Sequence, residues 1–250
     1  MDSLQLSVST SSVHKPKPRT PNGTRIYAIG DVHGRADLLG SLLARIDSDL
    51  KAYPVARSVQ VFLGDYIDRG PCSRQVIDLL VARRRRHTVL YLKGNHETLA
   101  AEFLNNPSVL TRWQQMGGAS TLLSYGISAA PHTDPGEQQQ IAAAFREALP
   151  ASHRQFIEGL ALSFTCGDFF FAHAGARPGI PLRQQRRQDL LWIRDTFLQH
   201  KHDFGKVVVH GHTPAKEPVV LPNRINIDTG AYATGRLTCL VLEGDQISFI

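Results

Sequence analysis

Five short motifs rich in aspartate, asparagine and histidine follow one another along the chain. They are GDVHG at 30–34, GDYIDRG at 64–70, GNHE at 94–97, HAG at 173–175 and GHTP at 211–214. Carboxylate, amide and imidazole donors together suit Mn²⁺, Fe, Zn²⁺ or Ni²⁺ better than Ca²⁺ or Mg²⁺. The motifs therefore indicate a site for transition-metal ions.

The spacing of these donors predicts two neighbouring ions. Asp31 and His33 are two residues apart on an extended segment, so both side chains can point toward one ion. Asp65 is the natural bridging ligand, because the two oxygens of one carboxylate can hold two cations. The neutral carbonyl of Asn95 limits the negative charge and leaves the site net positive for a phosphate dianion. The ligands expected to complete the second site are Asn95, His173 and His212.

Two close metal ions define a reaction class, because they can clamp the attacking and the leaving oxygen of an in-line displacement at phosphorus. A water that bridges two divalent cations loses a proton near neutral pH, and the bridging hydroxide then attacks phosphorus. His96 follows a predicted metal ligand and is the best candidate for general acid to the leaving alkoxide. Asp68 lies three residues after Asp65 and would orient His96 and hold it protonated. The guanidinium of Arg69 can offer a bidentate fork to phosphate oxygens.

Strand and helix patterns place the motifs where strands end. Strands are predicted at 25–29, 59–63 and 88–92, and the first three motifs begin one or two residues later. Helices are predicted over 36–50 and from Pro71 onward, so three strand–loop–helix units in a row imply a largely parallel sheet. In layered α/β folds, ligands gather at the carboxyl ends of strands, so this placement supports the site independently of the motif letters.

The second half of the chain predicts a helical insertion and then a further sheet. Residues 100–160 have a less regular helical pattern, and we interpret them as an insertion beside the site. A hairpin turn is predicted at 243–246. The strand-like segments after the insertion are 161–165, 169–172, 207–209, 224–227, 237–242 and 247–250. We therefore expect an α/β sandwich, with two packed sheets and helices outside.

Composition and charge bound the class of protein. With 250 residues, of which 42% are hydrophobic, the chain suits one domain with a large core. It has no apolar run of about 18 residues and no secretory signal, so we expect no membrane partner and a cytoplasmic location. Three cysteines without CxxC spacing indicate reduced thiols and no disulfide framework. The net charge of +6 favours anionic partners.

Two regions are expected along the chain. Residues 1–22, which begin with a stretch rich in Ser, Thr, Lys and Pro, are predicted to be a disordered tail, whereas 23–250 form the catalytic domain. Arginine clusters lie at 83–86 and 183–187. We interpret the first as the solvated end of a helix. The second is either a solvated loop or a basic rim that attracts acidic substrates.

The five motifs resemble those of the calcineurin-like metallophosphoesterases over roughly residues 24–243. The Asp-Arg-Gly form of the second motif resembles the phosphoprotein phosphatase family within them, and in detail the small bacterial and phage serine/threonine protein phosphatases. The resemblance implies a two-sheet αββα sandwich with a helical insertion. It also implies that one metal is held by Asp31, His33 and Asp65, and the other by Asp65, Asn95, His173 and His212.

Two further positions follow from this resemblance. Arg194, in LWIRD at 191–195, resembles the second phosphate-binding arginine of the bacterial enzymes. Pro214 stands where many metallophosphodiesterases have a last histidine that ligates the first metal, which leaves that metal more room for water. The expected substrate-binding residues are Arg69, Asn95 and Arg194.

The leading functional expectation is a dinuclear-metal phosphomonoesterase that hydrolyses phosphoserine and phosphothreonine, with phosphotyrosine as a further substrate. Its partners would be phosphoproteins or phosphopeptides, with no nucleic acid, and its two divalent ions would be Mn²⁺, with Fe, Zn²⁺ or Ni²⁺ as alternatives. The alternative function is a symmetrical dinucleoside tetraphosphate hydrolase, and a non-catalytic phosphate-binding module is a third. A dinucleotide would need a base-stacking surface, for which Trp113, Tyr125 and Trp192 are candidates, although core packing is favoured for each.

Overall fold

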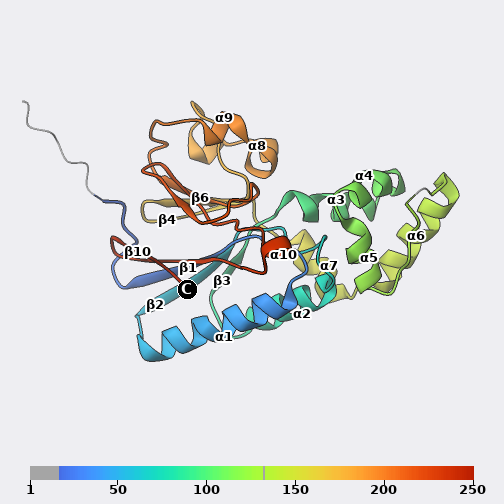
Figure 1. Cartoon of the computed structure of the whole chain (residues 1–250), viewed down its shortest axis with the longest axis horizontal. Coiled ribbons are helices and arrows are strands. Elements are labelled where there is room, and N and C mark those ends of the chain that lie inside the picture. Colours follow the sequence, from blue (N-terminus) through green and yellow to red (C-terminus); the bar gives the residue numbers. More distant parts are fainter. Residues whose placement is uncertain (1–16, 132) are drawn as a thin grey trace, which may run out of the picture.

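The computed structural model describes residues 17–131 and 133–250, and in this part of the chain two five-stranded sheets pack against each other (Figure 1). Helices pack on the outer face of each sheet. The predicted αββα sandwich is therefore confirmed.

The first sheet has the strand order β10-β9-β1-β2-β3. Its parallel part is β1 (Thr24–Ile29), β2 (Arg57–Phe62) and β3 (Val89–Tyr91), as the three strand–loop–helix units predict. β9 (Cys239–Glu243) runs antiparallel to β1 and forms a hairpin with β10 (Gln246–Phe249). Glu243 and Gln246 are paired at the end of this hairpin, which confirms the turn predicted at 243–246.

The second sheet has the order β4-β5-β6-β8-β7. β5 (Phe169–Ala172), β6 (Val207–His210) and β8 (Arg224–Asn226) are parallel, and β4 (Ser163–Cys166) pairs antiparallel with β5. The sequence pattern does not predict β7 (Val219–Val220), because a strand of two residues has no periodicity to detect.

Successive side chains of β1 point to opposite faces of the sheet, so this strand contributes to two hydrophobic cores. Ile26 and Ala28 join the core between the two sheets, whereas Tyr27 and Ile29 join the core beneath the helices. All six residues of β1 are buried. A strand buried on both faces reads as a continuous apolar run, which is the pattern that precedes the first motif.

Helices cover both outer faces of the sandwich (Figure 1). α1 (Ala36–Ala52) and α2 (Ser73–Arg83) pack on the first sheet, close to their predicted ranges. The helical region begins with the helix that the third strand–loop–helix unit predicts after β3, and its helices α4 to α6 project to the right in Figure 1. Its elements are α3 (Asn95–Phe103), η1 (Pro107–Val109), α4 (Leu110–Gln115), α5 (Gly118–Ser124), α6 (Pro135–Ala148) and α7 (Ala151–Glu158).

Short helices that the sequence pattern does not predict lie beside the second sheet and the motif loops. None of them exceeds six residues, which is too short for a helical period to be recognised. They are η2 (Leu182–Gln184), α8 (Arg187–Trp192), α9 (Asp195–Leu198) and α10 (Ala231–Thr234).

The segment that precedes β1 is hydrogen-bonded to two turns. Of the tail predicted over 1–22, residues 1–16 lie outside the described residues. Thr20 is buried; its N–H donates to the carbonyl of Gly244, and its Oγ1 accepts from the N–H of Gly244. Arg19 and Asp168 are also joined, because the N–H of each donates to the other residue. These bonds attach the start of the domain to the turns between β9 and β10 and between β4 and β5.

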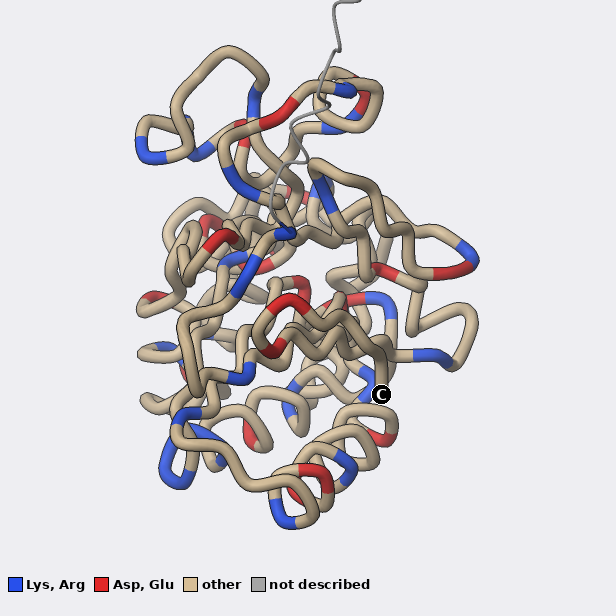
Figure 2. Tube along the Cα trace, turned by 90° about the vertical axis from the view of Figure 1, so that its left-hand side faces the viewer, with Lys and Arg blue, Asp and Glu red and all other residues tan. Residues whose placement is uncertain are grey.

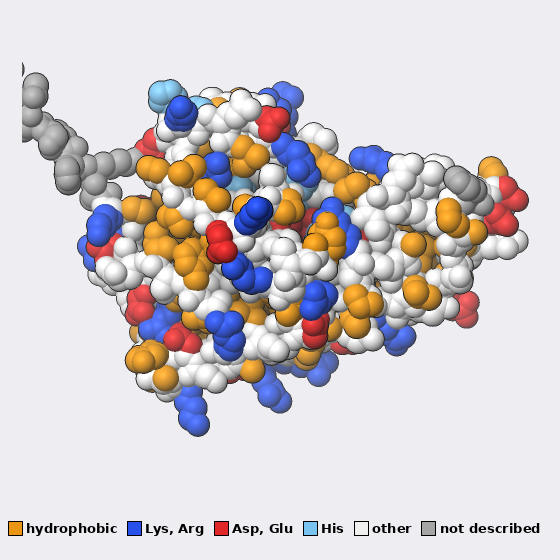
Figure 3. All heavy atoms as spheres, viewed as in Figure 1, with side chains coloured by type: hydrophobic (Ala, Val, Ile, Leu, Met, Phe, Trp, Pro, Cys, Tyr) orange, Lys and Arg blue, Asp and Glu red, His pale blue; other side chains and the backbone are white. Residues whose placement is uncertain are grey.

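Charged side chains are mixed over much of the surface. Lys and Arg positions are interspersed with Asp and Glu positions along the backbone trace in Figure 2. In the view of Figure 3, Lys and Arg side chains surround the position of α10, near the loops that carry the motifs. None of the helices in the described residues has the length and apolar character needed to cross a bilayer.

Candidate dinuclear metal site

Backbone strain is concentrated in the motif loops. Among the described residues, five that are not glycine have a positive φ, and each of them is a site residue predicted from the sequence. A left-handed backbone is costly for such residues, and it persists mainly at functional sites. They are His33 (45°), Asp65 (50°), Asp68 (72°), Arg69 (66°) and His212 (66°).

Two glycines allow close approach between motifs that lie far apart in the sequence. A Cβ at Gly94 would lie 2.0 Å from Oδ1 of Asp65, and one at Gly211 would lie 2.1 Å from Oδ1 of Asp31. Neither contact is sterically possible, so both positions require glycine. The glycine of one motif thus leaves room for the carboxylate of another.

Asp65 lies at the centre of the cluster. Its Oδ2 lies 3.6 Å from Nε2 of His33, 3.6 Å from Nε2 of His96 and 3.4 Å from Nε2 of His173. Burial alone would raise the pKa of the Asp65 carboxyl, but the surrounding imidazoles lower it below its usual range. Asp65 is therefore an ionised carboxylate shared among several imidazoles, as a bridging ligand must be.

Backbone hydrogen bonds fix which nitrogen of two imidazoles faces Asp65. Nδ1 of His33 lies 2.9 Å from the carbonyl oxygen of Ile67, and Nδ1 of His173 lies 3.0 Å from that of Leu63. A carbonyl only accepts, so each Nδ1 carries the proton and each Nε2 keeps a free lone pair. Burial lowers the pKa of both imidazoles, that of His33 to about 3, so both are neutral at pH 7. Both rings are therefore in the state that binds metal.

Several buried oxygen and nitrogen atoms of the site converge on one another or have no hydrogen-bond partner among the described residues. Oδ1 of Asn95 faces the bare Nε2 of His173 at 2.9 Å, so two acceptors point at each other. Nδ1 of His212 lies 3.2 Å from the same Nε2. Within the described residues, Oδ1 of Asp31 and Nε2 of His212 are buried without any hydrogen-bond partner. A cation would satisfy such converging lone pairs, so the donor set fits a metal.

Two groups of potential ligands share Asp65. In the described part of the chain, ligand atoms that lie within 4.8 Å of one another form the groups His33–Asp65–His96 and Asp65–His173–His212. This arrangement has the shared carboxylate that the sequence spacing predicts. By distance, His96 rather than Asp31 belongs to the first group. Asp31 instead accepts the N–H of His212 at 3.0 Å through Oδ2, and its Oδ1 remains free for a ligand.

Asp228 is a further carboxylate of the site, although it belongs to none of the five motifs. Burial raises the pKa of Asp31 well above its usual range, and the charges of Asp228 and Asp65 raise it further. The pKa of Asp228 is raised to about 6, with burial as the largest cause. Carboxylates that repel one another in this way favour a bound cation. Asp228 follows β8 by two residues, so the strand-end signal that marks the motifs could have found it.

His96 is oriented by a hydrogen bond to Asp68. Its Nδ1 lies 2.7 Å from Oδ2 of Asp68. That carboxylate also accepts the indole N–H of Trp113 at 2.9 Å and the hydroxyl of Thr121 at 2.6 Å. Burial alone would lower the pKa of His96, but Asp65 and the hydrogen-bonded Asp68 outweigh burial and raise it. The ring is thus poised to hold a proton at Nε2, on the side that faces the ligand cluster.

Glu97 holds the loop after β2 through hydrogen bonds. The sequence alone does not predict this role. It is fully buried, and burial raises the pKa of its carboxyl to about 7. Its two oxygens accept hydrogen bonds from the backbone N–H groups of Gly94, Asp65, Tyr66 and Ile67. Glu97 therefore positions the backbone that carries Asp65.

The two predicted phosphate-binding arginines lie at the edge of the cluster. Nη2 of Arg69 lies 3.4 Å from Nε2 of His96, and its guanidinium lies 4.8 Å over the ring of Tyr232. Arg194 is exposed. The pKa of His212 falls to about 2, mainly because the ring is buried. The neighbouring His173 and the charge of Arg194 lower this pKa further. Both guanidinium groups are thus close enough to attract a phosphate anion.

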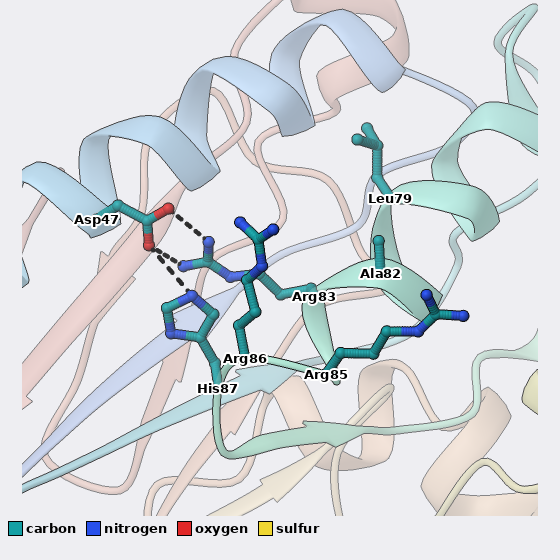
Figure 4. Close-up of a pocket in the computed structure, with 7 residues that line it drawn as sticks. All are labelled: Asp47, Leu79, Ala82, Arg83, Arg85, Arg86 and His87. Carbon is teal, nitrogen blue, oxygen red and sulfur yellow. Dashed lines mark hydrogen bonds and ion pairs between the residues drawn. The ribbon is translucent and has the colours of Figure 1, made fainter.

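The arginine cluster at 83–86 lies before β3, at the end of the strand opposite the GNHE motif. Arg83 is buried rather than solvated as predicted, because its Nη1 and Nη2 bind the Asp47 carboxylate at 2.7 and 2.5 Å. Figure 4 shows Arg83 and His87 turned toward Asp47, whereas Arg85 points away. The surface hollow there, about 370 Å³, is separate from the motif residues.

A model of the calcineurin-like phosphoesterases matches residues 24–245. The chain therefore belongs to this family, and it is a metal-binding hydrolase of the metallophosphoesterase superfamily. The predicted family is thus confirmed.

Named relatives and solved structures refine this comparison. The asymmetrical bis(5′-nucleosyl)-tetraphosphatase PrpE of Anoxybacillus flavithermus is 28% identical over 233 residues, which cover 85% of this chain and 88% of the relative. A putative diadenosine tetraphosphatase of known structure has a TM-score of 0.56 and 18% identity, over 92% of this chain and 97% of that chain. A cold-active protein tyrosine phosphatase has a TM-score of 0.59 and 19% identity, over 92% and 78%. Such structural similarity shows the fold alone.

The expectation of a serine/threonine protein phosphatase with phosphoprotein partners is wrong. Relatives that are 26–29% identical over 85–86% of the chain are named as asymmetrical bis(5′-nucleosyl)-tetraphosphatases. The physical reason is that the motifs supply metal ligands and a phosphate grip, which hydrolysis of any phosphoester or phosphoanhydride needs. They do not encode the group attached to the phosphate.

Proposed function

We propose that this chain hydrolyses dinucleoside tetraphosphates asymmetrically, into a nucleoside triphosphate and a nucleoside monophosphate. The observation that carries the proposal is the set of relatives with this name, which align over about 85% of the chain. The alternative function expected from the sequence is also a dinucleoside tetraphosphate hydrolase, but a symmetrical one. The relatives' names instead indicate asymmetrical cleavage. The geometry supports the proposal, because both ligand groups are assembled beside two guanidinium groups.

The proposed ligands are those of the sequence analysis, and they divide between two ions that share Asp65. One ion would be held by Asp31, His33 and Asp65, and the other by Asp65, Asn95, His173 and His212. Two divalent cations held there would act as Lewis acids on the phosphate oxygens and would make a water nucleophilic near neutral pH. Mn²⁺ is the expected activator in vitro, because the donors are carboxylate, amide and imidazole.

The chain's own side chains bind the phosphates and move a proton. Arg69, Arg194 and the amide of Asn95 bind non-reacting phosphate oxygens. His96 donates the proton on Nε2 to the oxygen of the leaving phosphate, while Asp68 keeps the ring oriented. The polyphosphate chain is strongly anionic, so the basic side chains around α10 attract it.

The direct test is product analysis with diadenosine tetraphosphate and Mn²⁺. Anion-exchange chromatography should detect equal amounts of AMP and ATP as the first products. ADP as the sole product would mean symmetrical cleavage, and no cleavage of the dinucleotide would overturn the proposal. A phosphoserine peptide and p-nitrophenyl phosphate, at equal concentration, are the comparison substrates, and the dinucleotide should have the highest kcat/KM.

A further inference from the structure

Trp192 ends α8 beside the second ligand group. Its ring centroid lies 6.3 Å from that of His212, with the planes at 82°. The guanidinium of Arg112, an exposed residue of α4, lies 5.4 Å over the Trp192 ring. A metal-ligand imidazole, an indole and a guanidinium are therefore in contact, although they come from three separate parts of the chain.

The other two candidates for base stacking, Trp113 and Tyr125, are buried and hydrogen-bonded inside the protein. Trp113 is fully buried and its indole N–H donates to Asp68. Tyr125 is 5% exposed and its hydroxyl lies 2.8 Å from Nδ1 of His153. Trp192, in contrast, is only partly buried, and its indole N–H has no hydrogen-bond partner among the described residues. Of the three, Trp192 alone combines accessibility with a place at the site.

The chemistry of this pair suits a nucleotide. Aromatic rings stack on nucleobases regardless of base identity, because every base has a π face. A planar guanidinium stacks on aromatic rings and also attracts phosphate. Trp192 and Arg112 thus offer one surface for a base and one charge for the phosphates attached to it.

We propose that Trp192 and Arg112 form a nucleobase subsite that selects which phosphorus of the dinucleotide is attacked. The inference rests on the proposed function and deepens it. In a nucleotide, a single ribose separates the base from its α-phosphate. A base stacked beside His212 therefore brings its own α-phosphorus, and not a central phosphorus of the chain, to the ligand cluster.

The resulting step accounts for asymmetrical products. Water gives up one proton to the solvent, its oxygen bonds to the α-phosphorus of the stacked nucleotide, and the bond from that phosphorus to the bridging oxygen breaks. The bridging oxygen leaves with the nucleoside triphosphate and takes up the proton from His96. The stacked nucleotide leaves as the monophosphate, which carries the oxygen of water.

Tyr232 is the competing aromatic residue, and its contacts give it another role. Its ring is 40% exposed, lies 5.4 Å from that of His33 and is covered by the guanidinium of Arg69 at 4.8 Å. This contact holds Arg69 in place for phosphate binding. Tyr232 is therefore a positioning residue in the proposal, and its replacement serves as an arm of the test.

Fluorescence reports binding directly, because the chain has two tryptophans and Trp113 is buried. Titration of the Mn²⁺-loaded protein with AMP should quench the emission of the native chain. Trp192→Phe should lose the quenching although AMP still binds, which equilibrium dialysis would measure. Equal quenching in both proteins would overturn the subsite.

Kinetics supply the second readout. For Trp192→Leu and Arg112→Ala, kcat/KM on diadenosine tetraphosphate should fall about tenfold more than on p-nitrophenyl phosphate, a difference of ~1.4 kcal/mol. Trp192→Phe should retain most of the activity, because it keeps a ring to stack. Tyr53→Ala, at an exposed aromatic residue between α1 and β2, is the control that should change neither. Equal losses on both substrates, or a larger selective loss in Tyr232→Ala, would overturn the assignment.

Reaction in ¹⁸O-labelled water tests which phosphorus is attacked. The outcomes also separate the nucleobase subsite from the proposed function. Label in AMP supports attack at the α-phosphorus of the stacked nucleotide, and label in ATP overturns it. If the protein leaves the dinucleotide intact but AMP quenches Trp192, the proposed function fails and the nucleobase subsite stands. If cleavage is normal in Trp192→Leu, the proposed function stands and the subsite fails.

Discussion

Nδ1 of His96 lies 2.7 Å from Oδ2 of Asp68, and neither side chain is more than 1% exposed. The same carboxylate accepts hydrogen bonds from Trp113 and Thr121, so its position does not depend on His96. The imidazole is therefore held at one nitrogen by a fixed anion, and Nε2 is the nitrogen that faces the ligand cluster. This geometry supports the proposed role of His96 as proton donor and predicts how variants of either residue should behave.

Replacement of His96 by Asn should affect poor leaving groups most. A general acid contributes about 10²- to 10⁴-fold to the rate, and we expect kcat on phenyl phosphate to fall by that order. The loss on p-nitrophenyl phosphate should be smaller, because p-nitrophenolate leaves without a proton. Metal content, measured by mass spectrometry, should be unchanged. Equal losses on the two substrates would mean that His96 is a ligand or a structural residue.

Asp68→Asn should move the alkaline limb of the pH–rate profile. Asp65 and Asp68 raise the pKa of His96, and activity requires the protonated ring, so activity is lost as pH rises through that pKa. Removing the charge of Asp68 lowers the pKa, so the loss should begin at a lower pH. Measurement of kcat/KM across pH 6 to 9 checks this, with Gln115→Ala at an exposed position of α4 as control. An unchanged limb would assign the titration to another group.

The sequence predicts the motif residues well because each carries its chemistry in a short segment. Asp31, Asp65 and His173 lie one to three residues after apolar strands, so the strand pattern and the residue type agree. Glu97 is different, because its role depends on the N–H groups of a loop about thirty residues away. The sequence next to His96 gives no sign that Glu97 accepts hydrogen bonds from that loop.

The substrate is the part that the sequence could not predict. In our proposal the nucleobase is recognised by Trp192 at the end of α8, and Tyr232 in α10 positions Arg69. Neither belongs to a motif, and helices of four to six residues have no period to detect. The phosphate chemistry was therefore recognisable, whereas the expected phosphoprotein substrate was wrong.

Asp65→Asn should be the most damaging single change at the site. It removes the charge of the only carboxylate shared by both ligand groups among the described residues. We expect metal occupancy and activity to fall together, while circular dichroism still reports the native fold. Near-normal turnover with two bound metals per chain would contradict the assignment of Asp65 as the bridging ligand.

Glu97→Gln should weaken the site without touching a ligand. An amide offers one acceptor oxygen where the carboxylate offers two, and its NH₂ would face backbone donors. Buried donors left without a partner cost roughly 1–3 kcal/mol, so the unfolding midpoint in urea and the affinity for Mn²⁺ should both decrease. Glu102→Gln, at an exposed position of the same helix, is the matched control. A variant with unchanged metal affinity would show that the loop after β2 holds its shape without Glu97.

Asp47→Asn should reduce stability only where the carboxylate is ionised. Arg83 lowers the pKa of Asp47 below its ordinary value near 3.8, with a hydrogen bond as the largest cause. A carboxyl whose folded pKa is lowered stabilises the fold above its unfolded pKa, and this contribution disappears as pH falls through the folded pKa.

At pH 7 the variant should therefore lose about 1 kcal/mol, since the half-exposed carboxylate is screened by solvent, and its Tm should fall by roughly 2–4 °C. Calorimetry should find that the difference in Tm narrows below about pH 4. Glu217→Gln, which removes the partner of the exposed Arg236, should change Tm little at any pH. A difference in Tm that is as large at pH 3 as at pH 7 would mean that Asp47 stabilises the fold by packing or by hydrogen bonds that an amide cannot replace, and not by its charge.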